Sequence, residues 1–99
     1  MTRGRTDANH AQILRVMRDL GAYVVDCSQV GEGFPDALVA YRGKWFLVEI
    51  KDGAKPPSRR KLTPDQNVFH AEAAHRGCHV HVVKNESEAL ALLGARRAA

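Results

Sequence analysis

The sequence has few cysteines and no long apolar run, and each shortage excludes a class of protein. Two cysteines, Cys27 and Cys78, are too few and too far apart for a disulfide framework or a zinc knuckle. We expect both to be reduced thiols that pack as small core residues. No apolar stretch approaches the roughly 18–20 residues that cross a bilayer, and no hydrophobic segment follows the basic N-terminus as in a secretory signal. We therefore expect a cytoplasmic protein with no membrane partner.

The chain is also short, since 99 residues leave room for one domain, over residues 1–99. Hydrophobic residues make up 44% and charged residues 26% of the sequence, which is an ordinary composition for a folded protein and argues against disorder. A domain of this size buries only about two thirds of its unfolded surface, so a symmetric homodimer would add stability.

Positive charge exceeds negative charge, with 15 Lys and Arg against 11 Asp and Glu, for a net charge of +4. Much of the excess lies in one short segment whose only acid is Asp52, and which holds Lys51, Lys55, Arg59, Arg60 and Lys61. Such a segment suits a polyanion such as nucleic acid. The alternative is a solvated loop with no partner.

Hydrophobic spacing and turn residues predict the order helix–strand–strand–strand–helix–strand–helix. The second helix has the clearest start, because Thr63 is a good N-cap, Pro64 suits the first helical position, and Gln66 completes a capping box. The other helices are predicted over 7–20 and 86–93, the strands over 22–27, 36–41, 44–51 and 79–84, and loops over 28–35 and 52–62. This order predicts an α/β fold with a mixed central sheet flanked by helices.

The second and third strands form a predicted hairpin about the turn Arg42-Gly43. In that register Asp36 lies opposite Glu49, and the alternation of side chains puts Glu49 and Lys51 on one face. Moving the turn by one residue would instead place Asp36 opposite Lys51, with Glu49 diagonal to it. Either register brings an Asp, a Glu and a Lys together.

Opposed carboxylates need a physical reason, because like charges at that distance repel each other. Two such groups either share a proton or hold a cation, and oxygen ligands suit Mg²⁺ or Mn²⁺. Lys51 can orient a water molecule or stabilise negative charge on a phosphate. The alternative is a strand end whose charged tips reach solvent, against which the apolar run Trp45–Val48 indicates a strand well inside the protein.

These residues resemble the active-site signature of the PD-(D/E)xK nuclease superfamily, and most closely that of its VRR-NUC branch. Pro35-Asp36 is followed by Glu49-Ile50-Lys51, as in the signature. The segment Gly33-Phe-Pro-Asp-Ala-Leu-Val is similar to the Gly-x-Pro-Asp-Leu motif of the branch, and Val48-Glu-Ile-Lys to its Val-Glu-Val-Lys. Leu62-Thr-Pro-Asp-Gln66 is similar to its Leu-Ser-x-x-Gln helix start. The resemblance covers nearly the whole chain and implies a restriction-endonuclease-like core in the order αβββαβ(α).

The resemblance also implies roles for particular residues. Asp36 and Glu49 would be metal ligands together with the backbone carbonyl of Ile50, and Lys51 would assist the attacking water. Gln66 would hold water or phosphate, although its capping-box position explains it equally well. One or two Mg²⁺ or Mn²⁺ ions are implied, with no organic cofactor.

Further candidates lie around this set. The family often carries an acidic residue on the first helix, which has no Glu here, so Asp7, Asn9 or His10 could take that role. Ser28, in the loop before Asp36, could contact substrate. His70 follows Gln66 by one helical turn and could approach the site, although simple packing or exposure explains it as well.

The function expected from these features is metal-dependent hydrolysis of phosphodiester bonds in DNA. The resemblance to stand-alone, Holliday-junction-resolvase-like members implies an endonuclease selective for branched DNA, acting as a homodimer and encoded by a phage in a bacterial host. Lys55, Arg59, Arg60 and Lys61 would contact the DNA backbone. The alternatives are a non-catalytic nucleic-acid-binding module with the same fold, and a nicking or flap nuclease that depends on a partner protein.

Overall fold

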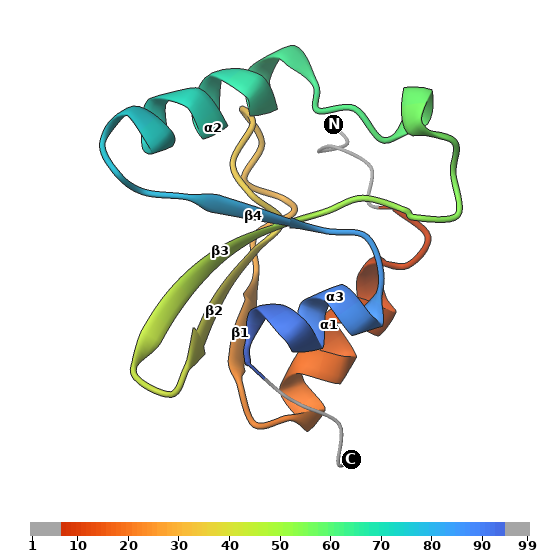
Figure 1. Cartoon of the computed structure of the whole chain (residues 1–99), viewed down its shortest axis with the longest axis vertical. Coiled ribbons are helices and arrows are strands. Elements are labelled where there is room, and N and C mark those ends of the chain that lie inside the picture. The colour runs from red at the N-terminus through yellow and green to blue at the C-terminus, as the bar shows by residue number, and fades with distance from the viewer. Residues whose placement is uncertain (1–6, 95–99) are drawn as a thin grey trace.

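Four strands form a mixed sheet in the computed structural model, which describes residues 7–94 (Figure 1). The sheet order is β1-β2-β3-β4, with β1 antiparallel to β2, β2 antiparallel to β3, and β4 parallel to β3. The strands are β1 (Tyr23–Asp26), β2 (Ala37–Tyr41), β3 (Lys44–Ile50) and β4 (Val80–Val83). The helices are α1 (His10–Asp19), α2 (Pro64–His75) and α3 (Glu86–Leu92), with a short 3₁₀ turn over Pro57–Arg59. The predicted α/β order is confirmed, with α1 beginning three residues later than expected.

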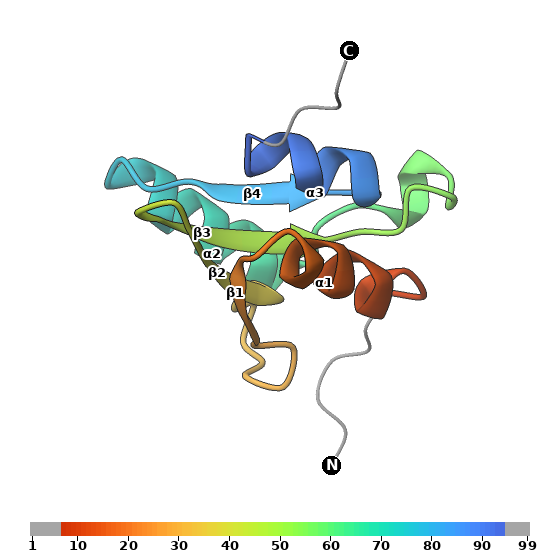
Figure 2. The ribbon, with the colours of Figure 1, turned by 90° about the horizontal axis from the view of Figure 1, so that it is seen from below.

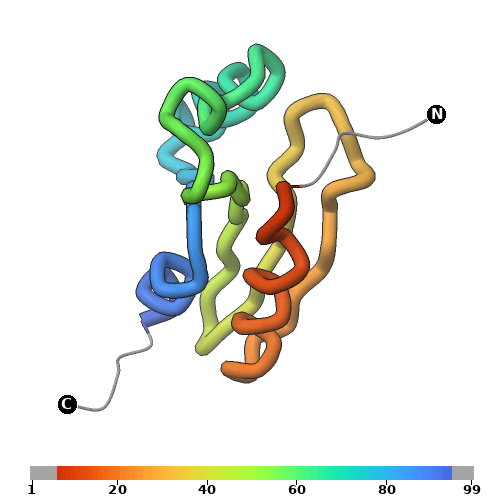
Figure 3. The backbone as a smooth tube through the Cα atoms, turned by 90° about the vertical axis from the view of Figure 1, so that its right-hand side faces the viewer, coloured from red at the N-terminus to blue at the C-terminus, as the bar shows by residue number. Residues whose placement is uncertain are grey.

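Two helices cover one face of the sheet, and the third lies at the far end of the other face. Helices α1 and α3 lie side by side, whereas α2 crosses the end of the sheet away from them (Figures 1 and 3). The apolar stripe of α1 packs inward through Ile13, Leu14 and Met17, against Val39 and Val48 of the sheet. Figure 2 shows α3 alongside β4, with α1 next to α3, and α1 also contacts β1. The hydrophobic core therefore lies between these two helices and the sheet.

The β2–β3 hairpin has the predicted turn at Arg42-Gly43, because Tyr41 pairs with Lys44 and Ala37 pairs with Val48. Positive φ angles of 48° at Arg42 and 80° at Gly43 are typical of a type I′ turn, whose twist matches that of the strands. The register that would place Asp36 opposite Lys51 is therefore excluded.

The apolar run at the start of β3 is less buried than its composition indicates. Val48, Glu49 and Ile50 are buried, but the side chain of Trp45 is 66% exposed. The prediction of a strand buried along its length is thus wrong for its first half, because nothing among residues 7–94 covers that part of the second sheet face. The cysteine expectation is also wrong, since Cys27 is half-buried and Cys78 is exposed.

Within residues 7–94, no helix has the length and apolar character that a membrane span requires.

Candidate active site

Two carboxylates meet where β2 begins and β3 ends. Asp36 directly precedes β2, and its Oδ2 accepts a hydrogen bond of 2.8 Å from the Ile50 backbone N–H. Glu49 is only 1% exposed. Burial raises the pKa of Glu49 to about 9, and the hydrogen bond and negative charge of Asp36 add to the increase, against an opposing effect of the Lys51 cation. Without a bound cation, the neutral acid is therefore the favoured form of Glu49 at neutral pH.

Gln66, in the first turn of α2, connects both candidate catalytic groups. Its Nε2 donates to Glu49 Oε2 at 3.0 Å, and its Oε1 accepts from Lys51 Nζ at 2.8 Å. The same Oε1 accepts from the Thr63 backbone N–H at 2.9 Å, and the predicted capping box is confirmed. An amide oxygen has two lone pairs, so both bonds form together. The start of α2 thereby fixes Gln66 in the site.

Lys51 follows β3 directly and is 9% exposed. Its Nζ donates to Gln66, while its backbone carbonyl accepts from Asn9 Nδ2 at 3.2 Å. Asn9 Nδ2 also donates to the Lys84 carbonyl at 3.0 Å, so one amide holds the ends of β3 and β4 together. The N–H and C=O of one strand residue lie on the same side of the strand, so the Ile50 carbonyl is directed towards Asp36.

His70 lies one turn after Gln66 and reaches the same carboxylate. Its Nε2 is 3.4 Å from Glu49 Oε1, and the side chain is 16% exposed. Burial lowers the pKa of His70, and the nearby Lys51 cation lowers it further. The neutral imidazole is therefore the form next to Glu49 at neutral pH.

A cleft of about 400 Å³ opens beside Asp36, Lys51 and Gln66, while Glu49 and His70 lie outside its lining. Its lining combines predicted residues with others, namely Asp7, Ser28, Gly31, Glu32, Gly33, Phe34, Asp36, Lys51, Thr63 and Gln66. Glu32 is a lining residue that was not predicted from the sequence, and it has a left-handed φ of 56° between two glycines. The Gly-Glu-Gly pattern just before Pro35-Asp36 was the available signal for it.

Gly33 allows α2 to approach the cleft closely. It has a φ of +80°, and a Cβ on it would lie 2.3 Å from the backbone oxygen of Asp65. Any larger residue would displace the first turn of α2, and with it Gln66. The glycine of the Gly-Phe-Pro-Asp motif therefore has a packing reason that the sequence pattern alone does not reveal.

The three candidates for the role of the first-helix acid have different surroundings. Asp7 lines the cleft, and its Oδ1 lies 3.3 Å from Lys55 Nζ. Asn9 binds the two strand-end carbonyls, and His10 Nε2 lies 3.3 Å from Asp26 Oδ2. Asp7 is thus the one of the three that the structure places in the lining of the cleft. Ser28 also lines it, and its backbone N–H donates to Asp26 at 3.0 Å.

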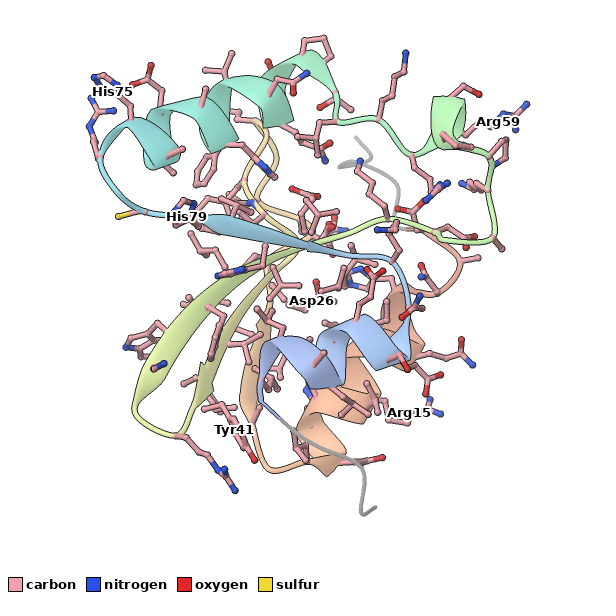
Figure 4. All side chains as sticks on the ribbon, viewed as in Figure 1. Arg15, Asp26, Tyr41, Arg59, His75 and His79 are labelled. Carbon is pink, nitrogen blue, oxygen red and sulfur yellow. The ribbon has the colours of Figure 1, made fainter. Side chains whose placement is uncertain are left out.

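The four basic candidates lie in the segment that connects Lys51 to α2. Arg59 and Lys61 are exposed and Arg60 is half-buried, whereas Lys55 is paired with Asp7. Figure 4 shows Arg59 at the outer edge of the molecule, beyond the end of α2. The segment is therefore accessible next to the cleft.

The donor set fits a hard divalent cation. Among residues 7–94, no group of three or more His, Cys, Asp or Glu side chains is arranged to hold a metal. Mg²⁺, however, usually keeps several waters and uses only one or two carboxylates. Asp36, Glu49 and the Ile50 carbonyl would supply such a set, and Lys51 Nζ bonds to Gln66 rather than to the carboxylates.

Comparisons with known proteins now add to this geometry. No protein-family model matches the sequence, and no curated protein matches it. A solved structure described as "VRR_NUC domain" is similar, with 26% sequence identity and a TM-score of 0.64, over 92% of this chain and 100% of that chain. The chain therefore has a restriction-endonuclease-like fold, and the likeness supports the VRR-NUC branch of the PD-(D/E)xK nucleases as its family.

Proposed function

We propose that this protein is a metal-dependent nuclease that hydrolyses phosphodiester bonds in DNA. The observation that carries the proposal is the pair of carboxylates, Asp36 and Glu49, one of them almost fully buried, beside Lys51. Burial next to a second acid raises the pKa of Glu49 to about 9. The ionised form of Glu49 is therefore unfavourable in the metal-free fold. The stability of the fold gives no reason for this pair of carboxylates, whereas a cation-binding site does.

Asp36, Glu49 and the Ile50 carbonyl would hold the cation. Once bound, Mg²⁺ or Mn²⁺ would supply Lewis-acid chemistry, withdrawing charge from a phosphate oxygen and making a water molecule more acidic. Lys51 Nζ, fixed by Gln66, would orient the attacking water and stabilise the negative charge that develops on the phosphate. Gln66 and His70 hold the two oxygens of Glu49, which keeps that carboxylate in one orientation.

Selectivity for branched DNA and a homodimer belong to the same proposal. Contacts to phosphate carry no base information, so the basic segment next to the cleft favours recognition of DNA by shape. A second copy would cover apolar surface on α2, which has no buried residue and exposes 61% of Val68. Two-fold pairing would add burial that this small core lacks.

Divalent metal is expected both to activate cleavage and to stabilise the fold. Flap and four-way DNA should be cut faster than linear duplex DNA with Mg²⁺ or Mn²⁺, and none of the three should be cut in EDTA. The metal should stabilise the protein by about 2.7 kcal/mol at a hundredfold excess over its Kd. Gel assays and thermal unfolding measure the two effects. Metal-independent binding without any cleavage would favour the non-catalytic module, and cleavage only after addition of a second protein would favour the partner-dependent nuclease.

The basic segment is expected to bind the DNA backbone without taking part in the chemistry. Replacing Arg59, Arg60 and Lys61 by serine should weaken binding to every sequence and reduce the slope of log K against log salt by up to about three units. The matched control is Arg15→Ser, on α1 (Figure 4), which should leave the slope unchanged. DNA-binding titrations at several salt concentrations measure the slope. An unchanged slope in the triple variant would show that the segment is a solvated loop that does not contact DNA.

A further inference from the structure

An ion pair connects the lining of the cleft to the basic segment. Asp7 lines the cleft, and its Oδ1 lies 3.3 Å from Nζ of Lys55, the first lysine after Lys51 in the segment that leads to α2. The start of α1 and the segment after β3 lie side by side here, where Asn9 Nδ2 donates to the Lys51 carbonyl (Figure 1). One lysine is thus shared between the candidate metal site and the candidate DNA-binding segment.

The backbones of both partners are fixed, whereas their side chains are partly exposed. The Asp7 carbonyl accepts a hydrogen bond of 3.0 Å from the His10 N–H, at the start of α1. The Lys55 N–H donates to the Asp52 carbonyl at 3.1 Å, in the turn that follows β3. The side chains are 21% exposed at Asp7 and 42% exposed at Lys55. A partly exposed ion pair adds little stability, so Lys55 can exchange Asp7 for another anion without loss of the fold.

The negative charge of Asp7 acts on the candidate metal ligands. Burial raises the pKa of Glu49 most, and the hydrogen bond and charge of Asp36 add to the increase. The charge of Asp7 acts in the same direction. A negative charge at this position also attracts a cation towards the cleft. Lys55 weakens that attraction while it is paired with Asp7 Oδ1, so any change that removes Lys55 from Asp7 strengthens cation binding.

DNA would supply a competing anion for Lys55. The basic segment continues from Lys55 to Arg59 and Lys61, which are exposed next to the cleft. Phosphates attract lysine side chains because each contact releases counterions from the DNA. A lysine ammonium is a point charge on a flexible stem and needs no fixed geometry to bind an anion. Lys55 can therefore move from Asp7 to a phosphate while its backbone stays in place.

We propose that Lys55 is exchanged between Asp7 and a DNA phosphate, so that DNA binding frees the Asp7 carboxylate to bind the metal ion. The inference rests on the proposed nuclease function, since it concerns the metal and the DNA of that same site. Coupling between two binding sites is reciprocal, so DNA binding is strengthened by the same factor when metal is bound. The protein thereby holds its metal most tightly when DNA is present.

Metal affinity without DNA tests the ion pair directly, with Mn²⁺ as the probe and electron paramagnetic resonance of the free ion as the measurement. Lys55→Met should raise the affinity for Mn²⁺ about 5-fold, at the lower end of the usual range for coupled sites. The same change in an Asp7→Asn background should raise it less than about twofold, because no carboxylate is then set free. Lys55→Arg keeps the positive charge and should bind Mn²⁺ like the wild type. Lys61→Met, at an exposed position of the same segment, is the matched control and should also bind like the wild type.

The effect of metal on DNA affinity tests the exchange itself. Lys51→Met is the background, because it should cleave slowly enough to leave the DNA intact during a titration. Fluorescence anisotropy of a labelled four-way DNA measures the affinity in EDTA and in Mg²⁺ at one salt concentration. The gain in affinity from Mg²⁺ should be about 5-fold smaller once Lys55 is also replaced by methionine. Mg²⁺ that binds the DNA itself affects both titrations equally and cancels from the comparison.

The possible outcomes separate this exchange from the nuclease proposal. Equal effects of Lys55→Met with and without the Asp7 carboxylate would reduce the pair to a simple charge effect and overturn the exchange. Unchanged Mn²⁺ affinity in Lys55→Met, or an equal gain from Mg²⁺ in both DNA titrations, would also overturn it and would leave the nuclease proposal intact. A wild-type protein that binds no Mn²⁺ would contradict the proposed metal site, and the exchange with it.

Discussion

Cleavage should disappear in Asp36→Asn and fall about 10²–10³-fold in Lys51→Met, but only the first variant should lose stabilisation by metal. Asparagine keeps an oxygen that can accept the 2.8 Å bond from Ile50 N–H, so the hairpin end should remain folded. It lacks the negative charge that a divalent cation requires. Methionine fills the largely buried position of Lys51 without its charge, and Gln66 keeps its bond from Thr63. Cleavage rates and metal-dependent thermal unfolding separate the two roles.

The matched control for this pair is Lys84→Met. Lys84 is half-buried and pairs with Glu88 at 3.3 Å, so the variant also removes a lysine but leaves the cleft unchanged. Its cleavage and its stabilisation by metal should equal those of the wild type. Full cleavage in Asp36→Asn would remove the carboxylate pair from the chemistry. Loss of metal stabilisation in Lys51→Met would mean that the lysine acts on the metal site rather than on water or phosphate.

The hairpin and the helix start could be predicted because both depend on local rules. Strand pairing about a two-residue turn fixes every partner, so locating Arg42-Gly43 was enough to bring Asp36 and Glu49 together. The capping box depends on three residues of one helix turn and is equally local. Gln66 belongs to the capping box and also bonds to Glu49 of the hairpin. Neither local prediction by itself shows that one residue has both contacts.

Features that depend on which sheet face is covered could not be predicted. Alternation assigns Trp45 and Glu49 to the same face, yet Trp45 is exposed and Glu49 is buried. The difference arises because α2 covers only the end of that face, and the period of a strand contains no information on where a distant helix lies. The contacts of Asn9 and Asp7 could not be predicted either, because their partners, Lys84 and Lys55, lie far along the chain.

The pH dependence of stability should reveal the buried acid directly. The pKa of Glu49 is raised from 4.5 to about 9, so in this interval the folded state holds a proton that the unfolded state releases. The free energy of unfolding of the metal-free protein should therefore fall as pH rises, by up to about 1.4 kcal/mol per pH unit. The lowered pKa values of His70 and His81 act with the opposite sign, but only below their ordinary value of 6.5. The raised pKa of Cys27 acts with the same sign as that of Glu49, but only as pH approaches the ordinary thiol value of 9.0. Denaturant unfolding in EDTA between about pH 7 and pH 8 therefore reports mainly on Glu49.

Glu49→Gln removes this titration while keeping the shape of the neutral acid. Its free energy of unfolding should be nearly independent of pH over that range and should exceed that of the wild type at the upper end. Glu72→Gln, at a carboxylate that is 66% exposed, is the matched control and should retain the wild-type slope. Saturating Mg²⁺ should abolish the wild-type slope, because the metal-bound folded state holds Glu49 ionised, as the unfolded state does over this pH range. A wild-type slope that matches that of Glu49→Gln would show that Glu49 is ionised without metal, and the stability cost assigned to the acid pair would be absent.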